Sequence, residues 1–306
     1  MKGNGVSGLW CAVGSALLCL ISGPASAASH WTDCLVAPTY QCLVEHAAAE
    51  AGQVPGRAAR AYAVALVAGA QAVGGRAEEA RGSAEDAILL GSIISDPADY
   101  GFLVSQLTWA RAWAGDLDMA GDMLGWTSDP YALALGYAAL AEAQAHHGYP
   151  EYAERSLRWA MEEAANVKSD RGLLLPYLAI SHGYVGNAEG VHRLIAEARN
   201  EASSSGSAYE RALAAAAGAV AEAMIGHVAD SDTMLSEAEA RLGEIEDETD
   251  IGVLASHLAW ALAEAGDAEG ARGVIKQIVQ LELASLTYQR RALIFSYAAL
   301  ALSRAK

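Results

Sequence analysis

The clearest pattern of apolar and polar positions runs from Leu258 to Ile275, with the sequence LAWALAEAGDAEGARGVI. It reads as the end of one helix, a turn at Gly266-Asp267, and the start of a second helix. A glycine in the left-handed conformation ends a helix well, and an aspartate after it caps the next one. The stretch therefore predicts a helical hairpin, and the same form recurs five more times upstream.

The six predicted hairpins align on the glycine between their helices, at Gly75, Gly115, Gly148, Gly186, Gly226 and Gly266, with spacings of 40, 33, 38, 40 and 40 residues. Small residues stand seven positions before each glycine, at Ala68, Thr108, Ala141, Ala179, Ala219 and Ala259. Small residues or valine stand five positions after it, at Ala80, Ala120, Ala153, Val191, Ser231 and Ala271. Small side chains let antiparallel helices approach closely, and a period in this range predicts stacked helix pairs.

The joints between hairpins carry helix-start signals. Asp96-Pro97 and Asp129-Pro130 each place a capping residue before a proline at the first helical position. Asp170 and Asp250 are expected to begin later units, and Asp116, Asn187 and Asp267 to cap the second helices. The serine-rich run at residues 203–207 is expected to be the most flexible connector.

These elements predict an all-α chain in four parts. Residues 1–27 form a signal peptide, and residues 28–56 a disulfide loop followed by a helix over residues 38–51. About six helix-turn-helix hairpins occupy residues 57–287, and a helix over residues 288–306 caps the stack. The few β-branched residues in the helix-like segments favour the same fold class.

The glycine-centred spacing resembles the tetratricopeptide repeat over about residues 57–285, although the aromatic residue which that family places four positions before the glycine is replaced here. The resemblance implies a right-handed solenoid whose first helices face a concave groove with residues six and two before the glycine. Those positions hold Trp109, Trp113, His146, Tyr184 and Trp260. Aromatic anchors in an acidic groove suit a peptide or partner helix, and the alternative is that they pack between hairpins as core.

The charge balance changes the expected partners. The chain has 20 basic and 37 acidic residues, with a net charge of −17, which disfavours nucleic acid and anionic membranes and favours a basic partner. Lys2, the apolar run to Ile21 and the Ala25-x-Ala27 pattern predict a signal peptide cleaved after Ala27. We therefore expect a periplasmic or secreted protein with no stable membrane anchor.

Two cysteines remain after the predicted cleavage, Cys34 and Cys42. In an oxidising compartment they are expected to form a disulfide, with two free thiols as the alternative. On one helix they would lie about 12 Å apart, too far to bridge, so we expect a loop that turns at Ala37 before a helix opened by Pro38.

Catalytic and metal-site motifs are missing from the sequence, so we expect no enzyme activity, no cofactor and no metal. His46 and Glu50 read as a surface pair rather than half a metal site, and His182 as a hydrogen-bonded core histidine. The predicted function is a scaffold or adaptor for a protein or peptide. The alternative is an (α/α)6 toroid that binds or cleaves carbohydrate, with carboxylates such as Glu142 and Glu222 in its funnel.

Overall fold

The computed structural model describes residues 34, 36–280 and 286–305, and every regular element in these ranges is a helix. The predicted signal peptide lies outside them. The helices are α2 (Tyr40–Gln53), α3 (Arg57–Val73), α4 (Ala77–Gly91), α5 (Pro97–Trp113), α6 (Leu117–Met123), the 3-10 helix η2 (Leu124–Trp126), α7 (Pro130–His146), α8 (Pro150–Ala164), α9 (Arg171–Tyr184), α10 (Ala188–Ser205), α11 (Ala208–Met224), α12 (Val228–Leu242), α13 (Glu248–Glu264), α14 (Ala268–Gln280) and α15 (Tyr288–Arg304). Within the described part of the chain, no helix is both long and apolar enough to cross a membrane.

The six predicted hairpins are confirmed. In each, the first helix ends two residues before the turn glycine and the second begins two residues after it. All six glycines have positive φ, between 75° and 90°. At Gly266, for example, the Asp267 amide donates to the Leu262 carbonyl at 2.8 Å and the Gly266 amide donates to Ala263 at 3.1 Å. This pair of bonds satisfies the last carbonyls of the helix and reverses the chain direction.

The small residues predicted at the helix crossings are buried. In the last hairpin, Ala259 of α13 and Ala271 of α14 are both fully inaccessible. The corresponding positions of the other five hairpins are buried as well. Methyl groups at these points let the two helices of a hairpin pack closely along their length.

The predicted helix starts are correct in part. Asp96 and Asp129 cap α5 and α7 through their side chains. Asn187 and Asp267 accept from the amides of Gly190 and Gly270.

Other predicted starts were wrong. Asp116 does not cap α6, because its carboxylate binds Arg81 and Arg111. Asp247, not Asp250, caps α13. Asp170, by contrast, directly precedes the first residue of α9 as predicted, although it has a left-handed conformation and forms no side-chain cap. Residues 203–205 continue α10, and Gly206 ends it.

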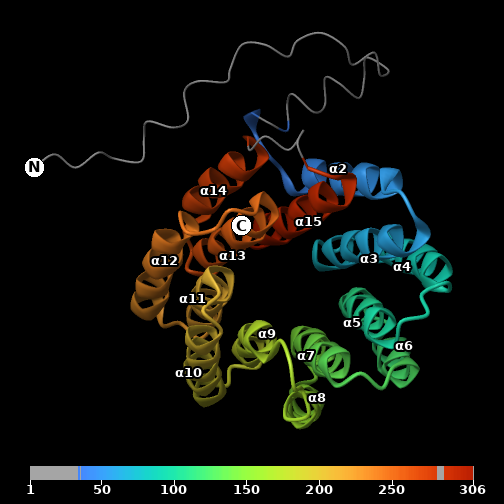
Figure 1. Ribbon diagram of the computed structural model, residues 1–306, viewed down its shortest axis with the longest axis horizontal. Helices are drawn as coiled ribbons and strands as arrows, with labels where there is room; N and C mark the ends of the chain where they lie inside the picture. The colour runs from blue at the N-terminus through green and yellow to red at the C-terminus, as the bar shows by residue number, and fades with distance from the viewer. Residues whose placement is uncertain (1–33, 35, 281–285, 306) are drawn as a thin grey trace, which may run out of the picture.

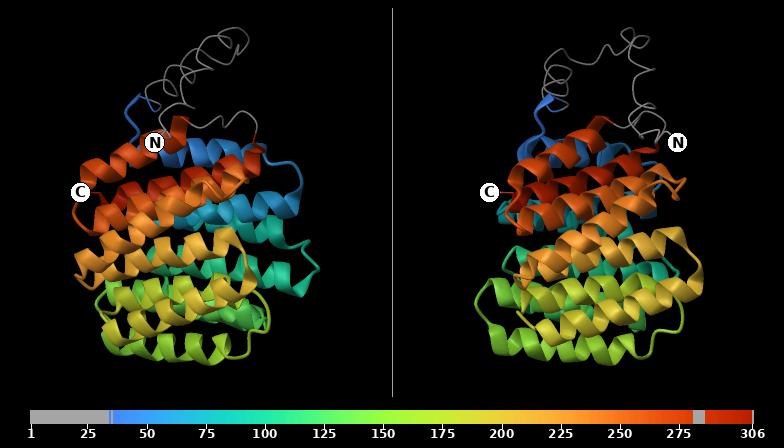
Figure 2. Two further views of the ribbon diagram at one scale, coloured as in Figure 1. Left: turned by 60° about the vertical axis from the view of Figure 1, so that its left-hand side comes forward. Right: turned by 90° about the vertical axis from the view of Figure 1, so that its left-hand side faces the viewer.

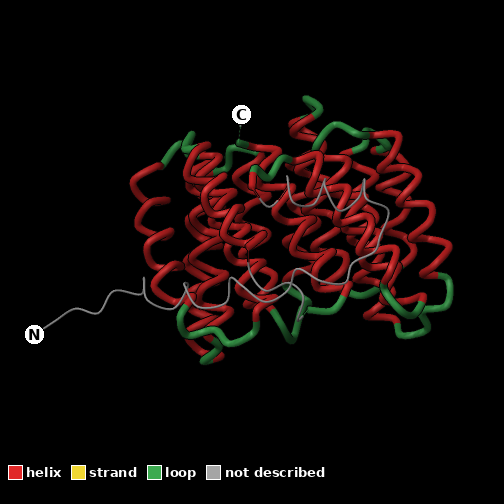
Figure 3. Tube along the Cα trace, turned by 90° about the horizontal axis from the view of Figure 1, so that it is seen from above, coloured by secondary structure: helices red, strands yellow, loops and turns green. Residues whose placement is uncertain are grey.

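The hairpins form a closed ring (Figure 1). Seven parallel helices make the inner wall, namely α3, α5, α7, α9, α11, α13 and α15, and each contacts the next. The wall closes because α15 packs against α2 and α3. The outer helices run antiparallel to it, so that the loops gather at two opposite ends (Figures 2 and 3).

Side-chain contacts hold the closure in place. Arg291 of α15 binds Glu50 of α2 at 2.8 Å, across 241 residues of sequence. The ring of Phe295, one of the largest fully buried side chains, lies against His46 with centroids 6.2 Å apart. The last helix was predicted to cap an open stack. Instead it joins the two ends of the chain.

Inner helices are buried on most sides, whereas outer helices are buried along one side only. Every residue of α11 from Ala212 to Ala223 is buried, because neighbours lie on all sides of an inner helix. In the outer helix α8 the buried residues form one stripe, Ala153, Ser156, Leu157, Ala160 and Ala164. A helix with one apolar stripe covers the wall and exposes its other side to solvent.

The predicted cysteine pair also comes together. The sulfur atoms of Cys34 and Cys42 lie within bonding distance, with Cα atoms 5.9 Å apart, which suits a disulfide. The helix that carries Cys42 starts at Tyr40 with Thr39 as its cap, two residues later than predicted from Pro38. Both cysteines are buried in the main apolar core, beside the point where the ring closes.

We expect Gly266→Ala to lower the free energy of unfolding by about 1–2 kcal/mol, because an L residue is strained at φ +90° although its Cβ would meet no atom. Gly273→Ala is the matched control. Gly273 lies in the adjacent helix α14 with the same free space and no positive φ, so alanine there should stabilise by up to about 1 kcal/mol. Urea unfolding of the two variants measures both effects, and equal effects would contradict the backbone argument.

Candidate functional site

A cavity of about 270 Å³ lies inside the ring, between α5, α7, α9, α11, α13 and α15. Aromatic side chains dominate its lining, including Trp109, Tyr131, Tyr177, Tyr209, Trp260 and Tyr297. Tyr131, Leu173 and Tyr209 stand at the amino-terminal ends of their helices, whereas Trp260 lies near the carboxyl-terminal end of α13. The cavity therefore extends along the inner wall.

Four tyrosines from four helices form a group in this wall, at Tyr131, Tyr177, Tyr209 and Tyr297. Burial raises the pKa of Tyr177 well above its ordinary value, and the other three hydroxyls add to the shift. All four phenols are therefore neutral at physiological pH. They supply apolar ring faces together with hydroxyl groups that donate or accept hydrogen bonds.

The depth of each side chain follows from its distance to the turn glycine. Trp109, Glu142, Ile180 and Trp260 all stand six residues before the glycine of their hairpin, and all line the cavity. In the first hairpin this position is Gly69, and a Cβ there would meet the Trp109 ring at 1.9 Å. The missing side chain of Gly69 therefore leaves the space in which the Trp109 indole lies.

Glu142 is the one charged side chain among the described residues that line the cavity. The Ser181 hydroxyl donates to its Oε1 at 2.6 Å. Burial raises the pKa of Glu142 to about 7, and Ser181, Arg304 and Trp113 only partly oppose that shift. The side chain is partly accessible through the cavity, and the surrounding protein disfavours the ionised carboxylate. It therefore exchanges a proton near neutral pH.

A second group of side chains lies at the carboxyl-terminal end of the inner wall. The Arg304 guanidinium lies 4.9 Å from the centroid of the Trp113 ring and 5.2 Å from that of Tyr184. It also lies 3.9 Å from Glu264 and donates to the Tyr184 hydroxyl. Trp113 packs against the His146 ring with centroids 4.6 Å apart. This arrangement holds one arginine between aromatic faces and a carboxylate.

All five residues predicted for the groove therefore lie on the inside of the ring. Trp109 and Trp260 line the cavity, and Trp113 and His146 line a second hollow, of about 620 Å³, at the carboxyl-terminal end. Tyr184 links the two groups through ring contacts with Trp113 and Trp260. Trp113 and Trp260 are nearly inaccessible, so they are core residues as well as lining residues.

Sequence reasoning missed the pairing of Arg304 with this end, because α15 was expected to lie at the end of a stack. It also named Glu142 and Glu222 together as possible funnel carboxylates. Glu142 faces the cavity, whereas Glu222 contacts His192 and His227. The register six residues before the glycine was the signal that could have identified Glu142.

Two histidine expectations were tested by the structure. His182 is buried as predicted but not hydrogen-bonded, since neither ring nitrogen has a partner, and burial lowers its pKa to about 4. The expected surface pair of His46 and Glu50 is replaced by other contacts. Glu50 binds Arg291, and the His46 ring lies against Phe295.

Comparisons with known proteins provide no further guidance. No protein-family model, curated protein or solved structure matches this chain. The geometry of the ring and its cavity is therefore the basis for any functional assignment.

Glu142→Gln tests the protonation of the cavity. The folded state favours the protonated carboxyl, so wild-type stability should fall by up to about 3 kcal/mol as pH rises from 4.5 to 7, and stay level above that. Glutamine keeps the oxygen that accepts from Ser181 and has no proton to lose, so the variant should not show this fall. The difference in unfolding free energy between the two proteins, measured by urea titration at each pH, isolates Glu142 from other titrating groups.

The exposed Glu269→Gln in the first turn of α14 is the control, and it should keep the wild-type pH profile. A difference curve between wild type and Glu142→Gln that is flat from pH 4.5 to 8 would show that Glu142 is not held protonated.

Proposed function

We propose that this protein is a binding protein that holds a small organic cation in the aromatic cavity inside its ring. The observation that carries the proposal is Glu142, the one charged side chain among the described lining residues, set among tryptophan and tyrosine rings. Aromatic faces attract cations most strongly where water is excluded. A buried carboxylate attracts any organic cation by its charge, and it adds a charge-assisted hydrogen bond where the cation carries N–H groups.

The charged side chains around Glu142 support a cationic ligand. Glu142 and Glu264 are two carboxylates, and Arg304 is the guanidinium that acts on both. One negative charge is left over when both carboxylates are ionised. At neutral pH a proton on Glu142 partly neutralises it, because the pKa of Glu142 is raised to about 7. A bound ammonium group would take the place of that proton.

The size of the cavity limits the ligand. About 270 Å³ is smaller than most drug-sized pockets, so the cavity suits a small molecule better than an extended peptide or partner helix. The expected basic protein partner could use this cavity in one form. A lysine side chain or an amino-terminal amine would enter the cavity, and the net charge of −17 would favour the encounter.

Binding is favoured over catalysis by the same lining. Glycoside hydrolysis generally uses a pair of carboxyl groups across the scissile bond, and a single carboxyl faces this cavity among the described residues. The closed ring agrees with the architecture of the toroid alternative. In that alternative Glu222 would be the second carboxyl group beside Glu142. It contacts His192 and His227 instead.

Choline and its neutral isostere 3,3-dimethylbutan-1-ol test the proposal. They share a shape and differ in charge, so we expect choline to bind roughly tenfold more tightly at pH 8. The titration is followed by tryptophan fluorescence, because Trp109 and Trp260 line the cavity. Glu142→Gln should remove the preference, and the exposed Glu269→Gln should retain it.

Proton release provides an independent measurement. Calorimetry of choline binding at pH 7 in two buffers of different ionisation enthalpy should show roughly half a proton released per site. Equal affinity for the two isosteres in the wild type, or preference for the alcohol, would contradict a cation site. An amidated lysine peptide in place of choline tests the protein-partner form of the proposal.

We also propose that the protein is exported and that its hairpins are tetratricopeptide-like. The Cys34–Cys42 pair, with Cα atoms 5.9 Å apart, supports an oxidising compartment, and the glycine-centred register supports the repeat type. The right-handed sense of the stack remains part of this proposal.

Export is tested by expressing the full chain in a bacterium and measuring the mass of the protein in the periplasmic or culture fraction. We expect an amino terminus at Ala28, with one intramolecular disulfide whose reduction raises the mass by two hydrogen atoms. Full-length protein confined to the cytoplasm would contradict it.

A further inference from the structure

A second cluster of functional side chains lies away from the cavity, on the outside of the ring. His192 comes from α10, Glu222 from α11, and His227 from the turn before α12. His192 Nε2 lies 3.3 Å from His227 Nδ1 and 3.4 Å from Glu222 Oε2, and the last two atoms are 3.1 Å apart. Three ligand atoms of the types that zinc prefers therefore form a nearly equilateral triangle.

The triangle has the dimensions of a zinc site. Ligand atoms at 2.0–2.1 Å from a tetrahedral zinc ion are about 3.3 Å from one another, as elementary geometry requires. The three separations in the protein lie within about 0.2 Å of that value, a tolerance accepted for metal sites. An ion would therefore bind with little movement of the side chains.

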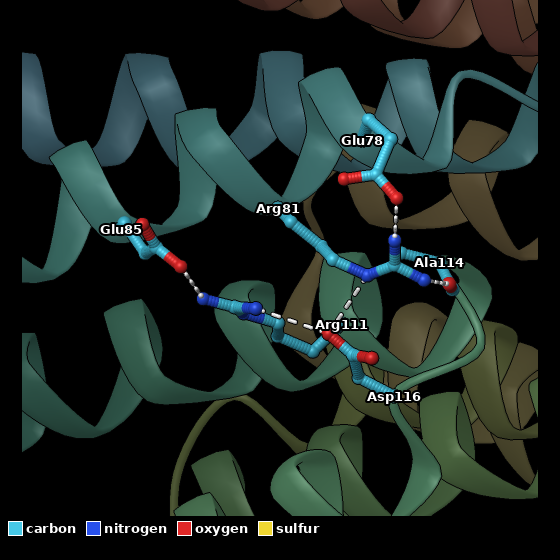
Figure 4. Close-up of polar contacts among 6 residues, drawn as sticks. All are labelled: Glu78, Arg81, Glu85, Arg111, Ala114 and Asp116. Atoms are coloured by element: carbon cyan, nitrogen blue, oxygen red, sulfur yellow. Dashed lines mark hydrogen bonds and ion pairs between the residues drawn. The ribbon is translucent and has the colours of Figure 1, made fainter.

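The hairpin architecture explains why these residues meet, and comparison with another hairpin shows what is unusual about them. Arg81, Arg111 and Asp116 occupy the corresponding positions three hairpins earlier in the ring, with the same sequence separations. There, two arginines hold Asp116, and Arg111 also binds Glu85 (Figure 4). These side chains form an ion-pair network in which two guanidinium groups lie beside the Asp116 carboxylate.

In the cluster of His192, Glu222 and His227, no arginine of the described chain lies beside the Glu222 carboxylate in this way. The Glu222 side chain is only 4% exposed, and among the described residues no lysine or arginine forms an ion pair with it. Its contacts among the described residues are with nitrogen atoms of the two imidazole rings. A buried carboxylate is costly without a positive charge beside it, and a divalent ion would supply that charge.

The site is also accessible. The His192 and His227 side chains are 50% and 43% exposed, and their rings stack with centroids 5.3 Å apart. An ion can reach the two nitrogens from solvent, while Glu222 closes the inner side. Asp230 lies next to the site, with its carboxylate oxygen 4.0 Å from His227 Nδ1. The fourth position is available to water or to this carboxylate.

We propose that His192, Glu222 and His227 bind a zinc ion. Two imidazoles and one carboxylate are a ligand set suited to zinc and to other borderline divalent metals. The ion would join α10 to the α11–α12 turn, which ties two neighbouring hairpins of the ring together. The sequence led us to expect no metal, because the ligands are spread over 35 residues without a motif.

The experiment is a titration of untagged full-length protein, purified without metal, with zinc chloride in a non-chelating buffer at pH 7.5. Calorimetry should give one ion per chain, and the thermal midpoint should rise with zinc concentration because the ion binds only the folded state. Cobalt chloride in place of zinc should produce the visible absorption of a tetrahedral site. Binding should weaken at pH 5.5, where protons compete for the imidazoles.

His192→Gln and His227→Gln test the ligands, and because both side chains are largely exposed the variants should fold. Each should lose zinc affinity by about tenfold or more. His147→Gln, an exposed histidine in another hairpin, is the matched control and should bind as the wild type does. Glu222→Gln should also weaken binding, with circular dichroism to confirm that it folds.

Two results would overturn the proposal. In the first, excess zinc gives no binding heat with folded wild-type protein and does not change its thermal midpoint. The cluster would then be two histidines that contact Glu222, without a metal. The other is zinc binding that persists unchanged in both histidine variants, which would place the ion elsewhere. Neither result bears on the cation cavity, since none of these residues lines it.

Discussion

The left-handed glycine between the two helices of each hairpin is the constraint on which the rest of the structure depends. Six turns with nearly the same φ send each outer helix back along its inner partner, so that all the inner helices run parallel. Each residue then has a depth in the ring that follows from its distance to the glycine. The candidate sites therefore lie at depths set by the distance of their residues from the turn glycine.

Three layers follow from this register. Six residues before the glycine, the side chains of four hairpins line the cavity, namely Trp109, Glu142, Ile180 and Trp260. Two residues before it, Trp113 and His146 gather at the carboxyl-terminal end. Four residues before it, polar side chains reach a second helix, either of their own hairpin or of the preceding one.

This third layer takes several chemical forms. Gln71 and Gln144 each accept a hydrogen bond from a serine twelve residues later, at 2.8 Å in both cases. Arg111 forms ion pairs in the same position, and Glu222 contacts two histidines. One structural position therefore supports a neutral hydrogen bond, a salt bridge or a carboxylate between two histidines, because only the depth and direction of the side chain are fixed by the fold.

What the sequence alone determined is local. The turn glycines, the aspartate caps at Asp96 and Asp129, and the small residues at the crossings depend on interactions within a few residues or one hairpin, and these predictions were confirmed. Tertiary structure alone decided the ring closure by α15, the burial of Glu142 and the meeting of His192 with Glu222. Each of these depends on the small rotation from one hairpin to the next, summed around the whole ring. That sum arises from many packing contacts together, so no local pattern of residues specifies it.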